Sequence, residues 1–351
     1  MVPDAVYTSV MNTPYLSVVS ELRDRPRRWL VTGAAGFIGS SLVDALLRLD
    51  QTVVGMDNFS TGHFRNLEYV REAVGMKRWQ RFRFLKADIR DARACRDAVA
   101  GVEYVLHQAA LGSVELSIAD PLTWNEVNVA GFLNVMFAAK EENVLNFVYA
   151  SSSAVNGYAP DALLGDEGGG IPLSPYAVTK SANEQYATVF RLCYGLVPVG
   201  LRYYNIYGPR QDPAGAYAAV IPKWIRAMIS GEVVKIHGDG QTTRDYCFVD
   251  DVVQANLLAA LAVPESTGRV YNIGANQQTS LKQLFSKLRA ILAEHGVNYP
   301  HPPVYGPFRV GDVRHSWADI STSEDLLGYR PEHTLDKGLE ATISWFLKNC
   351  K

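Results

Sequence analysis

The sequence lacks paired cysteines, a long apolar run and a strong charge of either sign. None of its four cysteines (Cys95, Cys193, Cys247 and Cys350) belongs to a Cys-x-x-Cys pair. Isolated cysteines of this kind indicate reduced thiols rather than a disulfide-built fold. No stretch approaches the ~18 apolar residues of a membrane span, and the N-terminus has no basic segment followed by an apolar one. We therefore expect a cytoplasmic protein with no membrane partner.

Charge and histidine content exclude two further classes. The net charge is −2 and the isoelectric point is about 6.4, so the composition does not indicate a nucleic-acid partner. The seven histidines form neither His-x-x-x-His nor His-Glu-x-x-His, and we predict no metal site. A chain of 351 residues, 48% hydrophobic, fits one large α/β unit or two domains.

A glycine-rich turn near the N-terminus predicts a dinucleotide site. A short apolar strand, 29–32, precedes Gly33-Ala-Ala-Gly36-Phe-Ile-Gly39, and a helix is expected over 40–49. Such glycines allow a tight turn and close approach of a pyrophosphate, which the helix N-terminus then stabilises. The next strand, 52–56, ends at Asp57. This is where a carboxylate binds the adenosine ribose, so we predict NAD rather than NADP, whose 2′-phosphate the acid would repel.

Strands and helices alternate through the first two hundred residues or so. We expect strands at 83–89, 98–107, 147–150 and 197–203, and long helices at 124–142 and 173–194. This alternation predicts an α/β fold with a doubly wound parallel sheet and ligands at the carboxyl ends of its strands. Beyond residue 204 we expect loop over 205–219, a strand at 233–237 and helices at 219–230, 249–261, 280–295 and 335–348.

The expected domain organisation has three parts. Residues 1–28 form an extension whose helix, from Pro14 to Arg28, either packs on the body or wraps around a dimer partner. Residues 29–204 form the NAD-binding Rossmann domain, to which the stretch at about 238–262 contributes late elements. Residues 205–351 form mainly a smaller α/β domain for the second ligand.

The stretch 151–180 carries the predicted reactive groups. Ser151 and Ser152 follow a strand, and Tyr176 lies four residues before Lys180. On a helix these two positions share one face, so the ammonium should favour the phenolate and lower the pKa of Tyr176. A serine hydroxyl beside them can hold a substrate hydroxyl. The three groups predict removal of a proton from an alcohol, although Tyr-x-x-x-Lys also occurs on ordinary helices.

Other polar residues have alternative interpretations. Arg244, Arg309 and Arg314 are candidates for an anionic ligand, because a guanidinium binds phosphate through two hydrogen bonds. Each is equally compatible with a solvated surface charge. His107 ends a predicted strand, and we expect it to be structural rather than catalytic.

Several motifs together resemble the extended short-chain dehydrogenase/reductase family. They are the GxxGxxG turn, the serine with YxxxK, RYYNIYGPRQDP at 202–213 and GDGQTTRDY at 238–246. The likeness runs from about residue 29 to residue 348 and is greatest to the nucleotide-sugar 4-epimerases. The UDP-N-acetylhexosamine branch is indicated by the N-terminal extension and by DNFSTG (57–62), ALGSV (110–114), GAYAAVIPKW (215–224) and GDVRHSWADI (311–320).

The resemblance implies sites for NAD and for a UDP-sugar. The implied NAD-binding residues are Gly33, Gly36, Phe37, Ile38, Gly39, Asp57, Asn58, Asp88, Ile89, Gln108, Tyr176, Lys180 and Tyr203. The implied catalytic residues are Ser152, Tyr176 and Lys180. The implied substrate-binding residues are Ser152, Ser153, Tyr176, Asn205, Arg244, Arg309, Asp312 and Ser316. A homodimer through the helices at 124–142 and 173–194 is implied as well.

The implied reaction is a 4-epimerisation without net redox change. Tyr176 takes the proton of the sugar 4-hydroxyl while C4 passes a hydride to NAD, and the 4-keto sugar turns over before the hydride returns. Ser316 stands where epimerases restricted to glucose and galactose carry a tyrosine, which leaves room for an N-acetyl group. The predicted pair is UDP-GlcNAc and UDP-GalNAc, with UDP-Glc and UDP-Gal or the N-acetylated uronic acids as further candidates.

Some alternatives stay open. The family pattern has Pro-Arg where this chain has Glu115-Leu116, and Tyr where it has Asn156, which leaves the exact sugar undecided. A UDP-glucuronate 4-epimerase or decarboxylase is possible because Arg314 or His315 could face a carboxylate. A 4,6-dehydratase would carry Asp-Glu beside the catalytic hydroxyl, where this chain has neither. The alternative of a different class is a non-catalytic nucleotide-binding regulator on the same fold.

Overall fold

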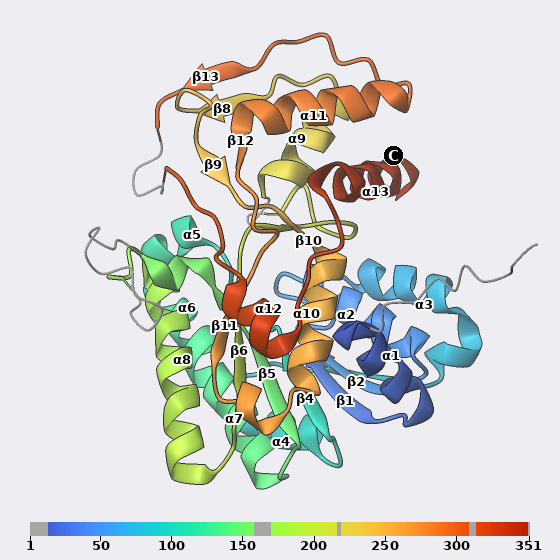
Figure 1. Ribbon diagram of the computed structural model, residues 1–351, viewed down its shortest axis with the longest axis vertical. Coiled ribbons are helices and arrows are strands. Elements are labelled where there is room, and N and C mark those ends of the chain that lie inside the picture. The colour runs from blue at the N-terminus through green and yellow to red at the C-terminus, as the bar shows by residue number, and fades with distance from the viewer. Residues whose placement is uncertain (1–12, 158–169, 216–218, 309–313, 350–351) are drawn as a thin grey trace, which may run out of the picture.

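A seven-stranded parallel sheet lies at the centre of this computed structural model, which describes residues 13–157, 170–215, 219–308 and 314–349 (Figure 1). Every neighbouring pair of its strands is parallel. The sheet order is β11 (Val270–Ile273), β6 (Val199–Tyr203), β5 (Asn146–Ser152), β4 (Tyr104–His107), β1 (Arg28–Thr32), β2 (Thr52–Asp57) and β3 (Phe82–Lys86). The order reverses between β1 and β4, where ligands bind in such sheets. The predicted doubly wound fold is confirmed.

Helices cover both faces of the sheet. On one face lie α1 (Pro14–Asp24), α2 (Phe37–Arg48), α3 (Phe64–Trp79), α10 (Val249–Ala260) and α12 (Ser321–Leu327). On the other lie α4 (Ala92–Val99), α7 (Phe132–Glu141) and α8 (Pro175–Tyr194). Trp29 and Val31 pack toward the first layer and Leu30 toward the second. Because both faces are covered, strand β1 is buried on both sides, and Trp29, Leu30 and Val31 form a continuous apolar run rather than an alternating pattern.

Two predicted elements differ from the structure. The strand expected at 98–107 begins only at Tyr104, because Ala92–Val99 forms α4. Asp91 caps that helix, and Cys95, Ala98 and Val99 lie on its buried side at helical spacing. The single helix expected at 124–142 is three segments: α6 (Pro121–Asn125), a π-helical segment η1 (Glu126–Gly131) and α7. The π-helical segment lies beside the ligand cavity described below, and such segments are frequent at functional sites.

The second half of the chain builds a smaller lobe over the sheet (Figure 1). Its helices are α9 (Val220–Ile229), α11 (Leu281–Glu294) and α13 (Leu335–Asn349). Its strands form the pairs β7 (Ile206–Tyr207) with β10 (Cys247–Phe248), β9 (Thr243–Arg244) with β12 (Thr279–Ser280), and β8 (Lys235–His237) with β13 (Val304–Gly306). A separate apolar core joins these elements. Three later elements, α10, β11 and α12, pack with the central sheet. The late contribution to the sheet domain therefore extends beyond the predicted stretch 238–262.

The N-terminal helix α1 packs on its own chain. The Thr13 side chain caps it by accepting from the Leu16 amide at 3.3 Å, and Pro14 occupies its first position. Leu22 is buried in the core beneath it, and the helix lies against α10. Within the described residues, no helix has the length and apolar content needed to cross a bilayer.

Candidate active site

A cavity of about 550 Å³ opens at the carboxyl ends of the sheet strands. Its lining includes Ser152, Tyr176 and Lys180, together with Asn205. It also includes the other eleven predicted NAD-binding residues: Gly33, Gly36, Phe37, Ile38, Gly39, Asp57, Asn58, Asp88, Ile89, Gln108 and Tyr203. The tertiary fold therefore brings the predicted catalytic and cofactor residues to one cavity, while their individual roles stay predictions.

The glycine turn has no room for side chains. Gly33 has φ +68°, and a Cβ there would lie 2.9 Å from the Ala109 amide nitrogen. A Cβ on Gly39 would lie 2.0 Å from the Gly33 carbonyl oxygen, so only glycine lets α2 pack this closely on the turn. Gly36 precedes α2, and no side chain of the described residues caps the first amides of this helix. Free amides at a helix N-terminus bind phosphate, so this turn fits a dinucleotide.

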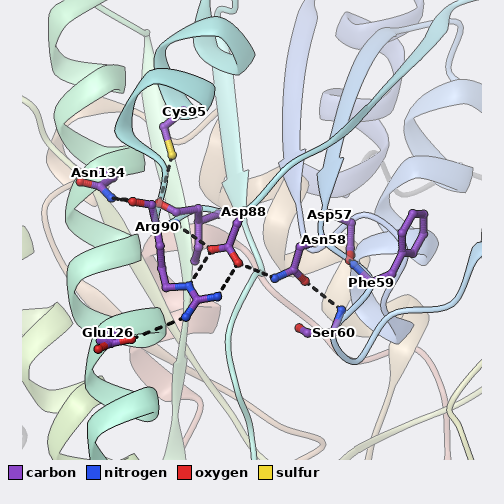
Figure 2. Close-up of polar contacts among 10 residues, drawn as sticks. Asp57, Asn58, Phe59, Ser60, Asp88, Arg90, Cys95, Glu126 and Asn134 are labelled. Atoms are coloured by element: carbon purple, nitrogen blue, oxygen red, sulfur yellow. Dashed lines mark hydrogen bonds and ion pairs between the residues drawn. The ribbon is translucent and has the colours of Figure 1, made fainter.

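Acidic residues follow strands β2 and β3 (Figure 2). Asp57 accepts from the amides of Ala35 and Phe59 at 2.9 and 2.7 Å, and burial raises the pKa of its carboxyl group despite these bonds. Asp88 lies between Arg90 and Asn58, which donate to it at 2.8 Å. The hydrogen bonds from Arg90 lower the pKa of Asp88 to about 2, so this carboxylate stays ionised at neutral pH.

The predicted catalytic set comes from one strand and one helix. Ser152 ends β5, while Tyr176 and Lys180 lie one turn apart near the start of α8. The Ser174 side chain caps that helix, which fixes where it begins. The Lys180 ammonium is buried and donates to the Ala150 carbonyl at 2.8 Å, so the lysine is tied to the strand that delivers the serine.

The pKa values correct one expectation. Burial raises the pKa of Tyr176, and the hydrogen bond from Ser152 lowers it by a smaller amount. The predicted net lowering of the Tyr176 pKa is therefore wrong for the chain by itself, because removing water from the phenol outweighs the hydrogen bond from Ser152. Burial likewise lowers the pKa of Lys180 to about 8, while the Glu184 carboxylate raises it.

A hydrogen-bonded triangle holds two of the predicted cofactor residues. The Tyr203 hydroxyl donates to Gln108 at 3.1 Å and accepts from Asn256 of α10 at 2.9 Å. The Gln108 amide donates to Asn256 at 3.1 Å, which closes the triangle. Tyr203 also pairs with Ser152 across β5 and β6. Asn256 was not predicted, since no motif in the sequence marks it.

Three predicted substrate residues do not contribute to the lining of this cavity. Ser153, Arg244 and Ser316 are not part of its lining. Arg244 and Ser316 nevertheless lie near each other, because the Ser316 amide donates to the Thr243 carbonyl at 3.3 Å. Arg309 and Asp312 lie outside the described residues.

Two residues that belong to the cavity or contact its strands were missed. Glu184 lies one turn after Lys180 and accepts from the Ser151 hydroxyl at 2.5 Å. Its i+4 spacing from the lysine was an available signal. Arg210 lines the cavity. It belongs to the motif RYYNIYGPRQDP, which was used to identify the family without a role being assigned to this arginine. Asn156, which stands where the family pattern has Tyr, donates from its side-chain amide to the Tyr204 hydroxyl at 2.8 Å.

The histidine that ends β4, His107, is packed in the protein interior. His107 is buried with its Nδ1 2.9 Å from the Thr32 hydroxyl, and burial lowers its pKa to about 3. It is therefore neutral and packed, in agreement with the structural role expected for it. Among the residues whose placement is described, no three potential metal ligands cluster.

Comparison with known proteins supports the resemblance inferred from the motifs. The sequence profile of the NAD dependent epimerase/dehydratase family matches residues 29–274. A UDP-glucose 4-epimerase of Mycolicibacterium smegmatis is 38% identical over 321 residues, 91% of this chain and 98% of that protein. The solved UDP-N-acetylglucosamine 4-epimerase from Methanobrevibacter ruminantium M1, in complex with UDP-N-acetylmuramic acid, has a TM-score of 0.82 at 36% identity and covers 92% of this chain and 99% of its own. MoeE5 in complex with UDP-glucuronic acid and NAD has a TM-score of 0.77 at 33% identity, covering 92% and 99%.

Proposed function

This chain belongs to the NAD dependent epimerase/dehydratase family, and we propose that it is a 4-epimerase of UDP-sugars. The observation that carries the proposal is the meeting of Ser152, Tyr176 and Lys180 in the cavity that also contains the glycine turn. An alcohol held there would face a proton acceptor and a cofactor site together. The similarity to two 4-epimerases over nine-tenths of the chain supports the same reaction class.

Tyr176 is the proposed proton acceptor for the sugar 4-hydroxyl, acting through its phenol oxygen. The Ser152 hydroxyl, which already hydrogen-bonds to Tyr176, would hold the same sugar oxygen. Lys180, fixed by the Ala150 carbonyl, keeps a positive charge one turn from the phenol.

Two features of the cofactor site fit NAD. They are the glycine turn that begins at Gly33, where a Cβ would clash, and the carboxylate of Asp57 at the end of β2. NAD, when bound, accepts and returns the hydride at C4, and its positive nicotinamide favours the Tyr176 phenolate. Asp57 would bind the ribose hydroxyls and disfavour a 2′-phosphate. The Gln108 and Tyr203 side chains, held by Asn256, would line the reactive end of the cofactor.

For the substrate we propose the UDP-GlcNAc and UDP-GalNAc pair. Ser316 is a small, half-buried side chain beside β9, and a small residue there leaves room for an N-acetyl group. Arg244 of β9 is the described residue that we propose for the substrate diphosphate. The similarity to a UDP-N-acetylglucosamine 4-epimerase supports this choice.

A UDP-uronic acid is the second candidate, supported by the similarity to a protein solved with UDP-glucuronic acid. The two residues expected to face a uronate, Arg314 and His315, already contact other side chains of this chain. Arg314 pairs with Asp239 at 2.5 Å, and His315 lies 3.0 Å from the Thr243 hydroxyl. An Arg314 already neutralised by a carboxylate attracts a second one weakly, which favours the neutral N-acetylated sugar.

The test is to incubate purified protein with UDP-GlcNAc, without added NAD, and to follow the sugar by proton NMR. Appearance of UDP-GalNAc would support the reaction, resident NAD and the N-acetyl substrate together. No conversion, even after NAD is added, would redirect the test to UDP-Glc and UDP-glucuronate. Failure to convert any of these would leave the non-catalytic nucleotide-binding regulator as the better account.

We further propose a cytoplasmic homodimer that pairs through α7 and α8. These helices expose an apolar stripe that includes Phe137, Val178, Val189 and Leu192. Leu192 is 71% exposed, and exposed large apolar side chains on two neighbouring helices are consistent with a protein–protein interface.

A further inference from the structure

The segment 208–215 of the smaller lobe crosses the cofactor half of the cavity. It follows β7, whereas the residues that it meets belong to α2 and to the loop before α3. Arg210, Gln211, Asp212 and Gly215 of this crossing segment line the same cavity as the glycine turn. The segment is therefore one wall of the cofactor site, although it comes from the other half of the chain.

Arg210 anchors the crossing segment on α2. Its guanidinium donates to the Ser41 hydroxyl at 3.0 Å and lies 3.5 Å from the Asp44 carboxylate. Arg210 has φ +68°, a left-handed conformation that is uncommon for a residue with a side chain. Such a conformation persists only where surrounding contacts maintain it, and the two α2 partners provide them.

Asp212 joins the crossing segment to the loop that follows Asp57. Its carboxylate lies 2.8 Å from the His63 Nε2. The His63 amide donates to the Ala35 carbonyl at 3.0 Å, so this histidine is itself tied to the glycine turn. The contact between Asp212 and His63 thus links both sides of the cavity at its adenosine end.

Two buried polar atoms of the crossing segment have no hydrogen-bond partner among the described residues: the Arg210 Nε and the Gln211 side-chain oxygen. Both residues line the cavity. Buried polar atoms are paired in most proteins, so unpaired ones in a cavity wall are consistent with a ligand-facing segment.

We propose that the Asp212–His63 contact closes the cavity over NAD and retains the cofactor between turnovers, with Arg210 anchoring the segment that carries Asp212. Retention matters chemically, because a cofactor lost in mid-reaction would carry away the hydride that the 4-keto sugar needs, and the sugar would stay oxidised. Asp212 and His63 are positioning residues in this account. The inference rests on NAD binding and is independent of which sugar is used.

The test measures cofactor release rather than turnover. The full chain is loaded with NADH, and the loss of bound fluorescence is followed after excess NAD is added. His63→Ala and Asp212→Ala should each release the cofactor about tenfold faster, as expected for the loss of a charge-assisted hydrogen bond. The double variant should be no faster than either single one, because the two residues act as a pair.

Conservative and control variants separate this role from a structural one. His63→Gln retains a side-chain donor and should restore slow release. Arg65→Gln is the matched control: Arg65 approaches the same carboxylate only at 3.7 Å, from a side chain that is 54% exposed, and release should not change. If Asp212→Ala does not fold, His63→Ala and His63→Gln decide the question by themselves. A wild-type release rate in His63→Ala, or release equally fast in His63→Gln and His63→Ala, would overturn the proposal.

Discussion

The Glu184 carboxylate binds the Arg202 guanidinium through two hydrogen bonds, at 2.9 and 2.7 Å. The same carboxylate accepts from the Ser151 hydroxyl. Ser151 pairs with Arg202 across β5 and β6, so this ion pair ties α8 to two strands. It lies one turn beyond Lys180 and next to the predicted catalytic serine. The arrangement of the reactive groups therefore depends on a pair that does not itself line the cavity.

Glu184→Gln should destabilise the fold. The side chains of Glu184 and Arg202 are only 12% and 19% exposed, and the variant leaves a mostly buried guanidinium without its counter-ion. We expect a loss of about 2 kcal/mol in the free energy of unfolding, measured by urea denaturation. Asp336→Asn is the control, because Lys287 and Asp336 form an exposed pair, and it should change stability by less than about 0.5 kcal/mol. Equal effects of the two variants would contradict the importance given to the buried pair.

Tyr176→Phe should abolish turnover while leaving cofactor binding nearly intact. The variant keeps the ring and loses only the hydroxyl that takes the proton, so we expect a decrease in kcat of about a thousandfold. Turnover is measured by proton NMR and bound NAD by release and chromatography. Tyr69→Phe is the control, since Tyr69 lies on α3, outside the lining of the cavity, and its hydroxyl donates to the Asn349 carbonyl at 3.5 Å. A Tyr176→Phe protein with normal turnover would exclude the assigned role.

Activity should decline above about pH 8, where the buried Lys180 ammonium loses its proton. Loss of that charge removes support for the Tyr176 phenolate. Glu184 raises the pKa of Lys180, so Glu184→Gln should shift the decline to lower pH. His107 also faces Lys180, but burial keeps it neutral and it does not titrate in this range. The measurement is kcat/KM across neutral and alkaline pH with NAD present. An identical alkaline decline in both proteins would show that another group controls it.

Asp88 should contribute stability that disappears in acid. Hydrogen bonds from Arg90 lower its pKa to about 2 in the folded chain, below the ordinary value of 3.8. The contribution is present above about pH 4 and is lost as the pH falls from about 4 to about 2, because the folded state binds the proton less readily than the unfolded one. The stability difference between the wild type and Asp88→Asn should therefore shrink in this range. Arg90→Gln should show the same pH dependence as Asp88→Asn, and a constant difference across the range would refute the coupling.

Leu192→Asp should separate the proposed dimer into monomers. Leu192 is an exposed apolar residue of α8, and a charge within an apolar interface is costly to bury. Sedimentation velocity gives the oligomeric state of the wild type and the variant. Leu326→Asp is the control, because Leu326 is also exposed but lies on α12. A monomeric wild type would reject the interface, and so would a Leu192→Asp protein that remains dimeric.

Short-range patterns in the sequence determined the fold class and the central residues of the site. The strand, glycine turn and helix around Gly33 depend on backbone geometry that local residue choice specifies. Tyr176 and Lys180 are coupled by helical spacing alone. Element boundaries were less certain, as the 98–107 strand shows, because a capped helix and a strand compete for the same apolar residues.

Only the tertiary structure decided which distant residues meet. The Asp212–His63 contact and the triangle of Gln108, Tyr203 and Asn256 join segments far apart in the chain, and no local pattern specifies them. Burial, which is a property of the packed molecule, also reversed the expected pKa shift of Tyr176. The sequence by itself thus determined the chemistry that the site can carry, through residue type and spacing. Packing decided the charge state of those groups and the walls that enclose them, because desolvation and long-range contacts exist only once the chain has folded.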